Sequence, residues 1–255
     1  MLWYKSWLET RWRFLIGLAL LTIVATGTII DYQAVIRLMP VARTIDLGGE
    51  LGRRIKEAVE IQRDYRGFVW WQWFRQNLTQ MGTLFAVILG SGGLLSRSSD
   101  GAPLFTLSLP ASRNRLLGVR AATGLGEFLV LAVVPSLLIP LLSPTIGQRY
   151  GVGDALVHSV CLFVAGTAFY SLAFLLSTVF GDHWRPLLIA GFVAVVLAAC
   201  ELTIEVLGRY GIFRVMSAEA YFRSGELPWL GLLASAALSM VMLYGAVKNV
   251  ARQDF

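Results

Sequence analysis

Six long apolar runs constrain the fold of this chain more than any other feature of its sequence. They lie at about residues 14–30, 78–96, 121–142, 155–180, 187–207 and 229–247. A helix crosses a bilayer with roughly 20 apolar residues, and within lipid a helix satisfies its own backbone polar groups. The 255 residues are 56% hydrophobic and only 15% charged, which leaves no tract for a separate soluble domain. We therefore expect one all-α domain over residues 1–255, a polytopic membrane bundle of six transmembrane helices with short interfacial helices.

The positive charges predict how the bundle is oriented in the membrane. The net charge is +6, and many of the cations flank the ends of apolar runs, among them Arg97, Arg113, Arg115, Arg120 and Lys248. Short cytoplasmic connections are enriched in Lys and Arg, and anionic lipid headgroups attract such residues. We therefore expect both termini in the cytoplasm, a multi-pass protein of the cell membrane, and lipid rather than nucleic acid as the partner of these charges.

Two segments outside the runs have helical patterns of their own. Residues 1–13 carry Trp3 and Trp7, four positions apart on one helical face, which predicts a short helix at the inner membrane interface. Residues 38–76 form the one long connection, with apolar positions at helical spacing. We expect an extracytoplasmic loop and helix there, closed at the outer headgroup level by the tryptophan-rich stretch 70–74.

Few polar residues lie within the runs, and each has a structural and a functional interpretation. Glu127, near the middle of the third run, costs roughly 2.5–3.5 kcal/mol to insert, so it either makes an interhelical hydrogen bond or lines a transport path. Glu201 and Glu205 are one turn apart near the outer end of the fifth run, where they reach the interface or form the mouth of that path. Ser91 and His158 leave open a Ser–His pair of a membrane hydrolase, against the alternative of a buried, hydrogen-bonded histidine.

The motif that binds nucleotide phosphates is absent from the sequence. A phosphate-binding loop needs G-x-x-x-x-G-K-[ST], and none of the three lysines, Lys5, Lys56 and Lys248, lies in that frame. The two cysteines and two histidines have no metal-ligand spacing. We therefore expect that the chain is not an enzyme and itself holds neither a metal nor a cofactor.

Between the second and third runs, residues 100–120 read DGAPLFTLSLPASRNRLLGVR. This stretch resembles the inner loop of ABC transporter permeases of the type-2 exporter family. Members of that family have an acidic residue and a glycine, a short helix, a Leu-Ser-x-Pro-x-Ser-Arg stretch and a basic start to the third span. The matching residues here are Asp100, Gly101, Leu107, Ser108, Leu109, Pro110, Ala111, Ser112 and Arg113. The layout of six runs and the LLSTVFGD at the end of the fourth also look like that family.

The resemblance implies one membrane half of a prokaryotic transporter. Two such halves, identical or different, would enclose a path, and two cytoplasmic ATPase subunits would carry ATP and Mg²⁺. Residues 98–118 would form the cytoplasmic coupling loop, with its ATPase contacts at Asp100, Gly101, Pro103, Leu104, Phe105, Leu107, Leu109 and Arg113. Three alternatives stay open: a non-transporting scaffold or sensor that binds an ATPase, a polytopic membrane hydrolase, and a self-contained channel.

Overall fold

The computed structural model of this chain is a bundle of long helices. It describes residues 2–44, 52, 58–92, 113–180, 182, 184–204 and 211–252, without the side chains of 38–44, 113 and 114. Within this part of the chain every regular element is a helix, as predicted. In chain order the elements are α1 (Leu2–Thr44), α3 (Tyr65–Val69), the π-helix η1 (Trp70–Leu78), α4 (Thr79–Gly90), α6 (Arg113–Leu142), the 3-10 helix η2 (Ser143–Ile146), α7 (Val152–Val179), α8 (Trp184–Thr203), α10 (Ile212–Met216), α11 (Glu219–Ser224) and α12 (Trp229–Arg252).

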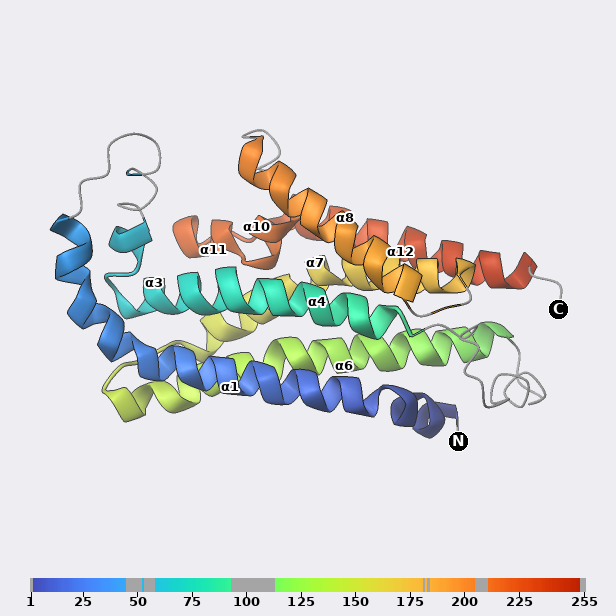
Figure 1. Cartoon of the computed structure of the whole chain (residues 1–255), viewed down its shortest axis with the longest axis horizontal. Helices are drawn as coiled ribbons and strands as arrows, with labels where there is room; N and C mark the ends of the chain where they lie inside the picture. The colour runs from blue at the N-terminus through green and yellow to red at the C-terminus, as the bar shows by residue number, and fades with distance from the viewer. Residues whose placement is uncertain are drawn as a thin grey trace.

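The long helices lie along a common direction and alternate in sense (Figure 1). α1, α6 and α8 start at the end of the bundle that holds the N-terminus, and α4, α7 and α12 run back toward it. The contacts between α4 and α7 confirm that these two helices are parallel. Gly82 of α4 packs on Leu162 of α7, and Gly90, eight residues later, packs on Tyr170, also eight residues later. We call the end where α1 starts and α12 finishes the terminal end. The opposite end, toward which α3, α10 and α11 lie, is the far end.

Within the described residues, five helical segments are long and apolar enough to cross a membrane. They are Leu2–Arg37, Arg115–Ile146, Val152–Val179, Trp184–Thr203 and Trp229–Arg252, and they correspond to the first and the third to sixth predicted spans, although the fifth ends at Thr203 rather than at 207. The second predicted span, 78–96, is represented by α4, which ends at Gly90. α3, η1 and α4 follow one another without a break, and together they form a helix that runs beside α7 (Figure 1).

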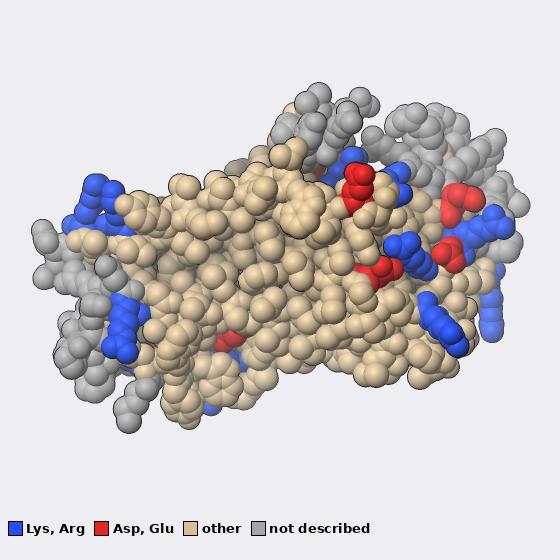
Figure 2. Space-filling view, turned by 180° about the vertical axis from the view of Figure 1, so that it is seen from behind, with Lys and Arg blue, Asp and Glu red and all other residues tan. Residues whose placement is uncertain are grey.

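The surface has the charge distribution of a membrane-embedded protein. Charged side chains gather toward both ends of the molecule, and a broad, almost uncharged band lies between them (Figure 2). Large apolar side chains are exposed on α8 and α12, including Phe192, Val195, Leu233 and Val241. Exposed apolar area of this extent is disfavoured in water but is the normal surface of a helix in acyl chains. The five long apolar helices therefore indicate a protein embedded in a membrane.

α7 is the central helix of the bundle. In the most apolar part of α7, 61% of the residues are buried inside the protein, against 17% for α8. Small residues let its neighbours approach closely, since Ala165, Ala168 and Ala173 of α7 are at most 4% exposed. α4, α6, α8, α10 and α12 all contact α7, so it is the helix around which the bundle is packed.

Two segments differ from the sequence-based expectation. Residues 2–13 are the first turns of α1 and continue directly into the first span, so no separate interfacial helix precedes it. The stretch around 70–74, expected to face the outer headgroups, is instead in the protein core, where Trp70, Trp73 and Phe74 are at most 1% exposed. Both tryptophans can be buried because their indole N–H groups have acceptors. Trp70 Nε1 donates to the Ser217 carbonyl oxygen at 3.0 Å, and Trp73 Nε1 donates to Oγ of Ser136 in α6 at 3.2 Å.

Candidate functional site

Most of the predicted ATPase-contact segment lies outside the described residues. This holds for Asp100, Gly101, Pro103, Leu104, Phe105, Leu107 and Leu109, and for the side chain of Arg113, whose backbone begins α6. The structure does describe the helices on either side. α4 finishes and α6 starts at the terminal end of the bundle, where α1 also begins (Figure 1). The segment is therefore attached at the same end as the first turns of α1.

Two arginines converge where α4 leads into that segment. A Cβ atom at Gly92 would lie 3.2 Å from Nη2 of Arg120 and 3.4 Å from Nη1 of Arg13. Nη1 of Arg120 also pairs with Oε2 of Glu9 at 3.2 Å. Positive charge is favourable beside the carbonyl end of a helix, and α4 ends two residues before Gly92. These contacts join the terminal ends of α1, α4 and α6.

Glu127 is a buried carboxyl group at the contact between α1 and α6. Its residue is 6% exposed, and the Thr10 hydroxyl donates a 2.5 Å hydrogen bond to its Oε1. Its Oε2 has no hydrogen-bond partner among the described residues. The structure thus provides the interhelical hydrogen bond that was one of the two interpretations of Glu127. The partner comes from the first turns of α1, which places this contact in the terminal half of the bundle.

The other two residues of the predicted path have different surroundings. Oε1 of Glu201, near the end of α8, accepts a 3.2 Å hydrogen bond from the backbone N–H of Phe213 in α10. A Cβ atom at Gly211 would overlap the Glu201 carboxyl group, so the backbone approaches it closely just before α10. A carboxylate there satisfies amide groups that have no partner within the helix. Glu205 lies outside the described residues, and the structure does not bring Glu201 and Glu127 together.

The two residues of the hydrolase hypothesis lie apart. Ser91 follows α4 and its Oγ donates to the Ile88 carbonyl oxygen at 2.9 Å. Its neighbour Gly90 packs on Tyr170 of α7. Tyr170 and His158 lie on the same helix, about three turns or 18 Å apart. Nδ1 of His158 is 3.1 Å from the Ser217 carbonyl oxygen. His158 is therefore a buried, hydrogen-bonded residue, and the Ser–His pair is not formed.

Aromatic rings surround His158 at the far end of α7. Phe74 of η1 stacks on the imidazole with ring centroids 4.4 Å apart. Trp70 lies parallel to Phe222 of α11 at 4.2 Å, with an interplanar angle of 2°. The carbonyl oxygen of Ser217 meets both Trp70 Nε1 and His158 Nδ1, so one peptide group between α10 and α11 is bound by two helices of the bundle. This far-end cluster fixes the short helices onto η1 and α7.

An ion pair completes the far-end cluster. Nε of Arg66 in α3 is 3.0 Å from Oδ2 of Asp154 in α7, and the Tyr221 hydroxyl donates to Oδ1 of the same carboxylate at 2.9 Å. The hydrogen bond to Asp154, followed by burial, raises the pKa of Tyr221. Burial, followed by the charge of Asp154, raises the pKa of Tyr150, whose hydroxyl has no hydrogen-bond partner in the described part of the chain. Asp154 thus connects α3, α7 and α11.

The far-end cluster was not predicted from the sequence. Asp154 and Tyr221 are 67 positions apart, and no local pattern indicates that they meet. Two features of the sequence could have indicated this cluster: the acidic residue Asp154 at the start of a predicted span, and the aromatic-rich connection before the last span. Among the described residues no group of three or more His, Cys, Asp or Glu side chains is placed to hold a metal ion.

No protein-family model, curated protein or solved structure matches this chain.

Proposed function

We propose that this chain is the membrane-spanning permease subunit of an ATP-binding cassette transporter. It would move a substrate across the cell membrane of a prokaryote, in the direction of export, with energy from ATP hydrolysed on a separate subunit. ATP and Mg²⁺ would be held by that ATPase, and a second permease half, identical or different, would complete the path. The observation that carries the proposal is the position of the segment that bears the permease motif. It joins α4 to α6 at the terminal end, where α4 packs on α7 and α6 packs on both α1 and α7.

α4 packs on α7, and α6 packs on both α1 and α7. Gly82 and Gly90 bring α4 into close contact with α7. The Thr10–Glu127 hydrogen bond and the Glu9–Arg120 ion pair hold α6 to α1. A force on the connecting segment would therefore reach α1 and α7 through the helices packed on them. An ATPase that binds this segment differently in its open and closed states would shift the bundle between two arrangements.

The test is association with an ATPase. A Leu104→Asp and Phe105→Asp double variant should insert into the membrane normally but lose co-purification of the ABC ATPase subunit encoded nearest to its gene. Charge in an apolar contact patch is costly to desolvate, so the loss should be at least tenfold. The matched control is Thr145→Asp with Gln148→Asp in the turn around η2, at the far end. Equal ATPase recovery from the double variant and from the wild-type protein would overturn the proposal.

A non-transporting scaffold that binds an ATPase is the second candidate, and one observation favours it. Glu127 is packed against Thr10, as expected of a structural carboxyl group rather than one that lines a path. Spin labels at Thr145 and Ser224, both exposed at the far end, separate the two candidates. With the ATPase bound, addition of ATP and Mg²⁺ should change the distance between the labels in a transporter. In a scaffold the distance should stay the same.

A further inference from the structure

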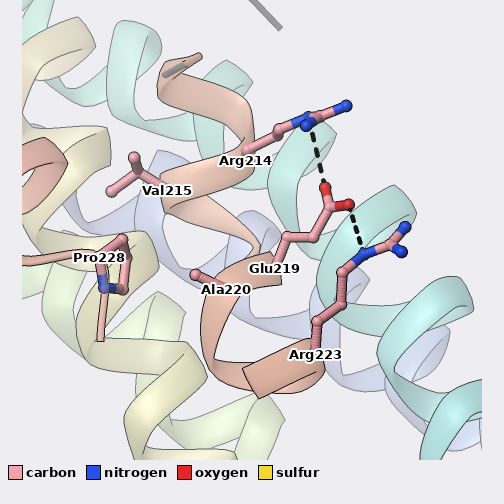
Figure 3. Close-up of a pocket in the computed structure, with 6 residues that line it drawn as sticks. All are labelled: Arg214, Val215, Glu219, Ala220, Arg223 and Pro228. Carbon is pink, nitrogen blue, oxygen red and sulfur yellow. Dashed lines mark hydrogen bonds and ion pairs between the residues drawn. The ribbon is translucent and has the colours of Figure 1, made fainter. Parts of the chain in front are cut away.

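We propose that the pocket between α10, α11 and the start of α12 binds a phosphate group. The pocket has a volume of about 420 Å³ and is lined by Arg214, Val215, Glu219, Ala220, Arg223 and Pro228 (Figure 3). Neither the permease motif nor the contacts discussed above use its charged residues. The proposal does not depend on transport, since a scaffold or a permease could carry the same site.

Two guanidinium groups and one carboxylate set the charge of the pocket. Glu219 lies between the arginines, with Oε1 2.9 Å from Nε of Arg223 and Oε2 3.5 Å from Nε of Arg214. The Glu219 side chain is 8% exposed, whereas those of Arg214 and Arg223 are 49% and 50% exposed. The negative charge is thus buried behind two accessible positive groups, and the three side chains leave one net positive charge.

The backbone around Glu219 fixes the positions of both arginines. Ala218 has a φ of 50°, in the left-handed region, which turns the chain sharply between α10 and α11. That turn places Arg214 on one side of Glu219, and the helical i, i+4 spacing places Arg223 on the other, as Figure 3 shows. Glu219 contacts the Nε position of each guanidinium. Arginines held in place before binding lose less side-chain entropy when they bind an anion.

The chemistry of this arrangement matches a phosphate group. A guanidinium presents parallel N–H donors that fit two oxygens of a phosphate, and two such groups can share its remaining oxygens. The apolar wall formed by Val215 and Pro228 would contact the ester side of the ligand. A phosphate ester therefore suits the pocket better than a free metal cation or a neutral solute, because Arg214, Arg223 and Glu219 together carry one positive charge and the other lining residues are apolar.

The membrane is one source of such a ligand. Pro228 adjoins Trp229 and Leu230, which begin α12 and are 63% and 79% exposed. Tryptophan at the end of a transmembrane helix is typical of the headgroup level, where phospholipid phosphates lie. A soluble phosphate ester is the other source, and its recognition would use the same two arginines. The experiment distinguishes them by offering each separately.

The experiment measures binding to the full-length chain purified in a neutral detergent. Phosphatidylglycerol binding is followed by native mass spectrometry, with phosphatidylcholine as competitor, and glycerol 3-phosphate binding by calorimetry. We expect saturable binding of at least one of the two, which identifies the source. Arg214→Gln should weaken it by about tenfold, the effect of losing one charge-assisted hydrogen bond. Arg214→Lys should weaken it less, because the charge stays but the planar donor pair is lost.

Glu219→Gln separates a ligand site from a purely structural ion pair. In a phosphate site this variant removes the competing negative charge, while the glutamine oxygen can still accept from Nε of Arg223 and hold it in place. Binding should therefore tighten several-fold, opposite in direction to Arg214→Gln. In a purely structural triad, both variants would lower stability and neither would change binding specifically. Arg149→Gln, an exposed position near the far end, is the control for net charge alone. Binding that is absent, or that falls equally in Arg214→Gln and Arg149→Gln, would overturn the proposal.

Discussion

Gly90→Ala tests the closest contact between α4 and α7. A Cβ atom at position 90 would overlap the carbonyl oxygen of Tyr170, and it would lie 3.0 Å from the Cβ of Ala173 and 3.2 Å from the backbone nitrogen of Phe174. Two of these three neighbours are backbone atoms of α7, which cannot rotate away as a side-chain end could. The added methyl group therefore requires that the two helices move apart.

The expected cost follows from two opposing effects. Overpacking a well-packed contact typically costs about 1–3 kcal/mol, and the rigid backbone neighbours place this case toward the upper end. Alanine gains about 0.5–1 kcal/mol over glycine within a helix, and Gly90, as the last residue of α4, should gain toward the lower end of that range. The net change in the free energy of unfolding should be a loss of about 2 kcal/mol. Gly126→Ala in α6 is the matched control, because no atom of the described residues lies within 4 Å of its Cβ position, and it should gain up to about 1 kcal/mol.

The assay is reversible unfolding in mixed micelles, followed by tryptophan fluorescence. Trp70 and Trp73 are buried in the bundle, so their emission reports loss of its packing. Gly90→Ala should unfold at a lower denaturant fraction than the wild-type protein, and Gly126→Ala at an equal or higher one. If Gly90→Ala were as stable as Gly126→Ala, α4 and α7 would not be in the contact described here, and the pairing of helices behind the proposed function would lose its basis.

Two further changes test the terminal and far ends. Thr10→Ala removes the one hydrogen bond described for Glu127 and should lower the free energy of unfolding by about 1–2 kcal/mol. Thr10→Ser keeps a hydroxyl and should lower it less. Equal stability of the two variants would contradict that hydrogen bond. Folding favours the neutral phenol of Tyr221, because its pKa is raised above the usual 10.0 by the bond to Asp154. That stabilisation is complete below pH 10.0 and is lost as the pH rises through the folded-state pKa. The wild-type protein should therefore lose stability above pH 10.0 more steeply than Tyr221→Phe, and parallel pH profiles would contradict this assignment.

The sequence predicted the helical spans well where a long apolar run ends in polar residues. The second span was harder to delimit, because the helix extends back through Trp70–Leu78, a stretch that is not apolar overall. Tryptophans mark a headgroup interface in many membrane proteins, but the same residues fill a core when neighbours accept their N–H groups. Here Ser217 and Ser136 provide those acceptors from other helices. Nothing near position 70 in the sequence distinguishes the two outcomes.

For the candidate site residues, the sequence predicted which side chains must be shielded from lipid, but not which residues they contact. The sequence predicted that Glu127 must be shielded from lipid, because that follows from the cost of a carboxyl group in a membrane. Its partner was not predictable, since Thr10 is 117 positions away. Glu201 was predictable as polar near the end of a span, but not as the acceptor for an amide of α10. The Glu219–Arg223 pair, in contrast, has the local i, i+4 spacing that a sequence shows directly.

The position of α7 shows how the two ends of the bundle are mechanically connected. At the far end Asp154 of α7 binds Arg66, which lies on the helix that continues into α4. At the terminal end Tyr170 of α7 packs on Gly90 of the same helix. Two attachments this far apart hold the α3–α4 helix against α7 over much of its length, so we expect the two to move together. Under the proposed function, a displacement of α4 at the motif-bearing segment would therefore reach the Asp154 contacts, and with them α11, without a change in the helices between.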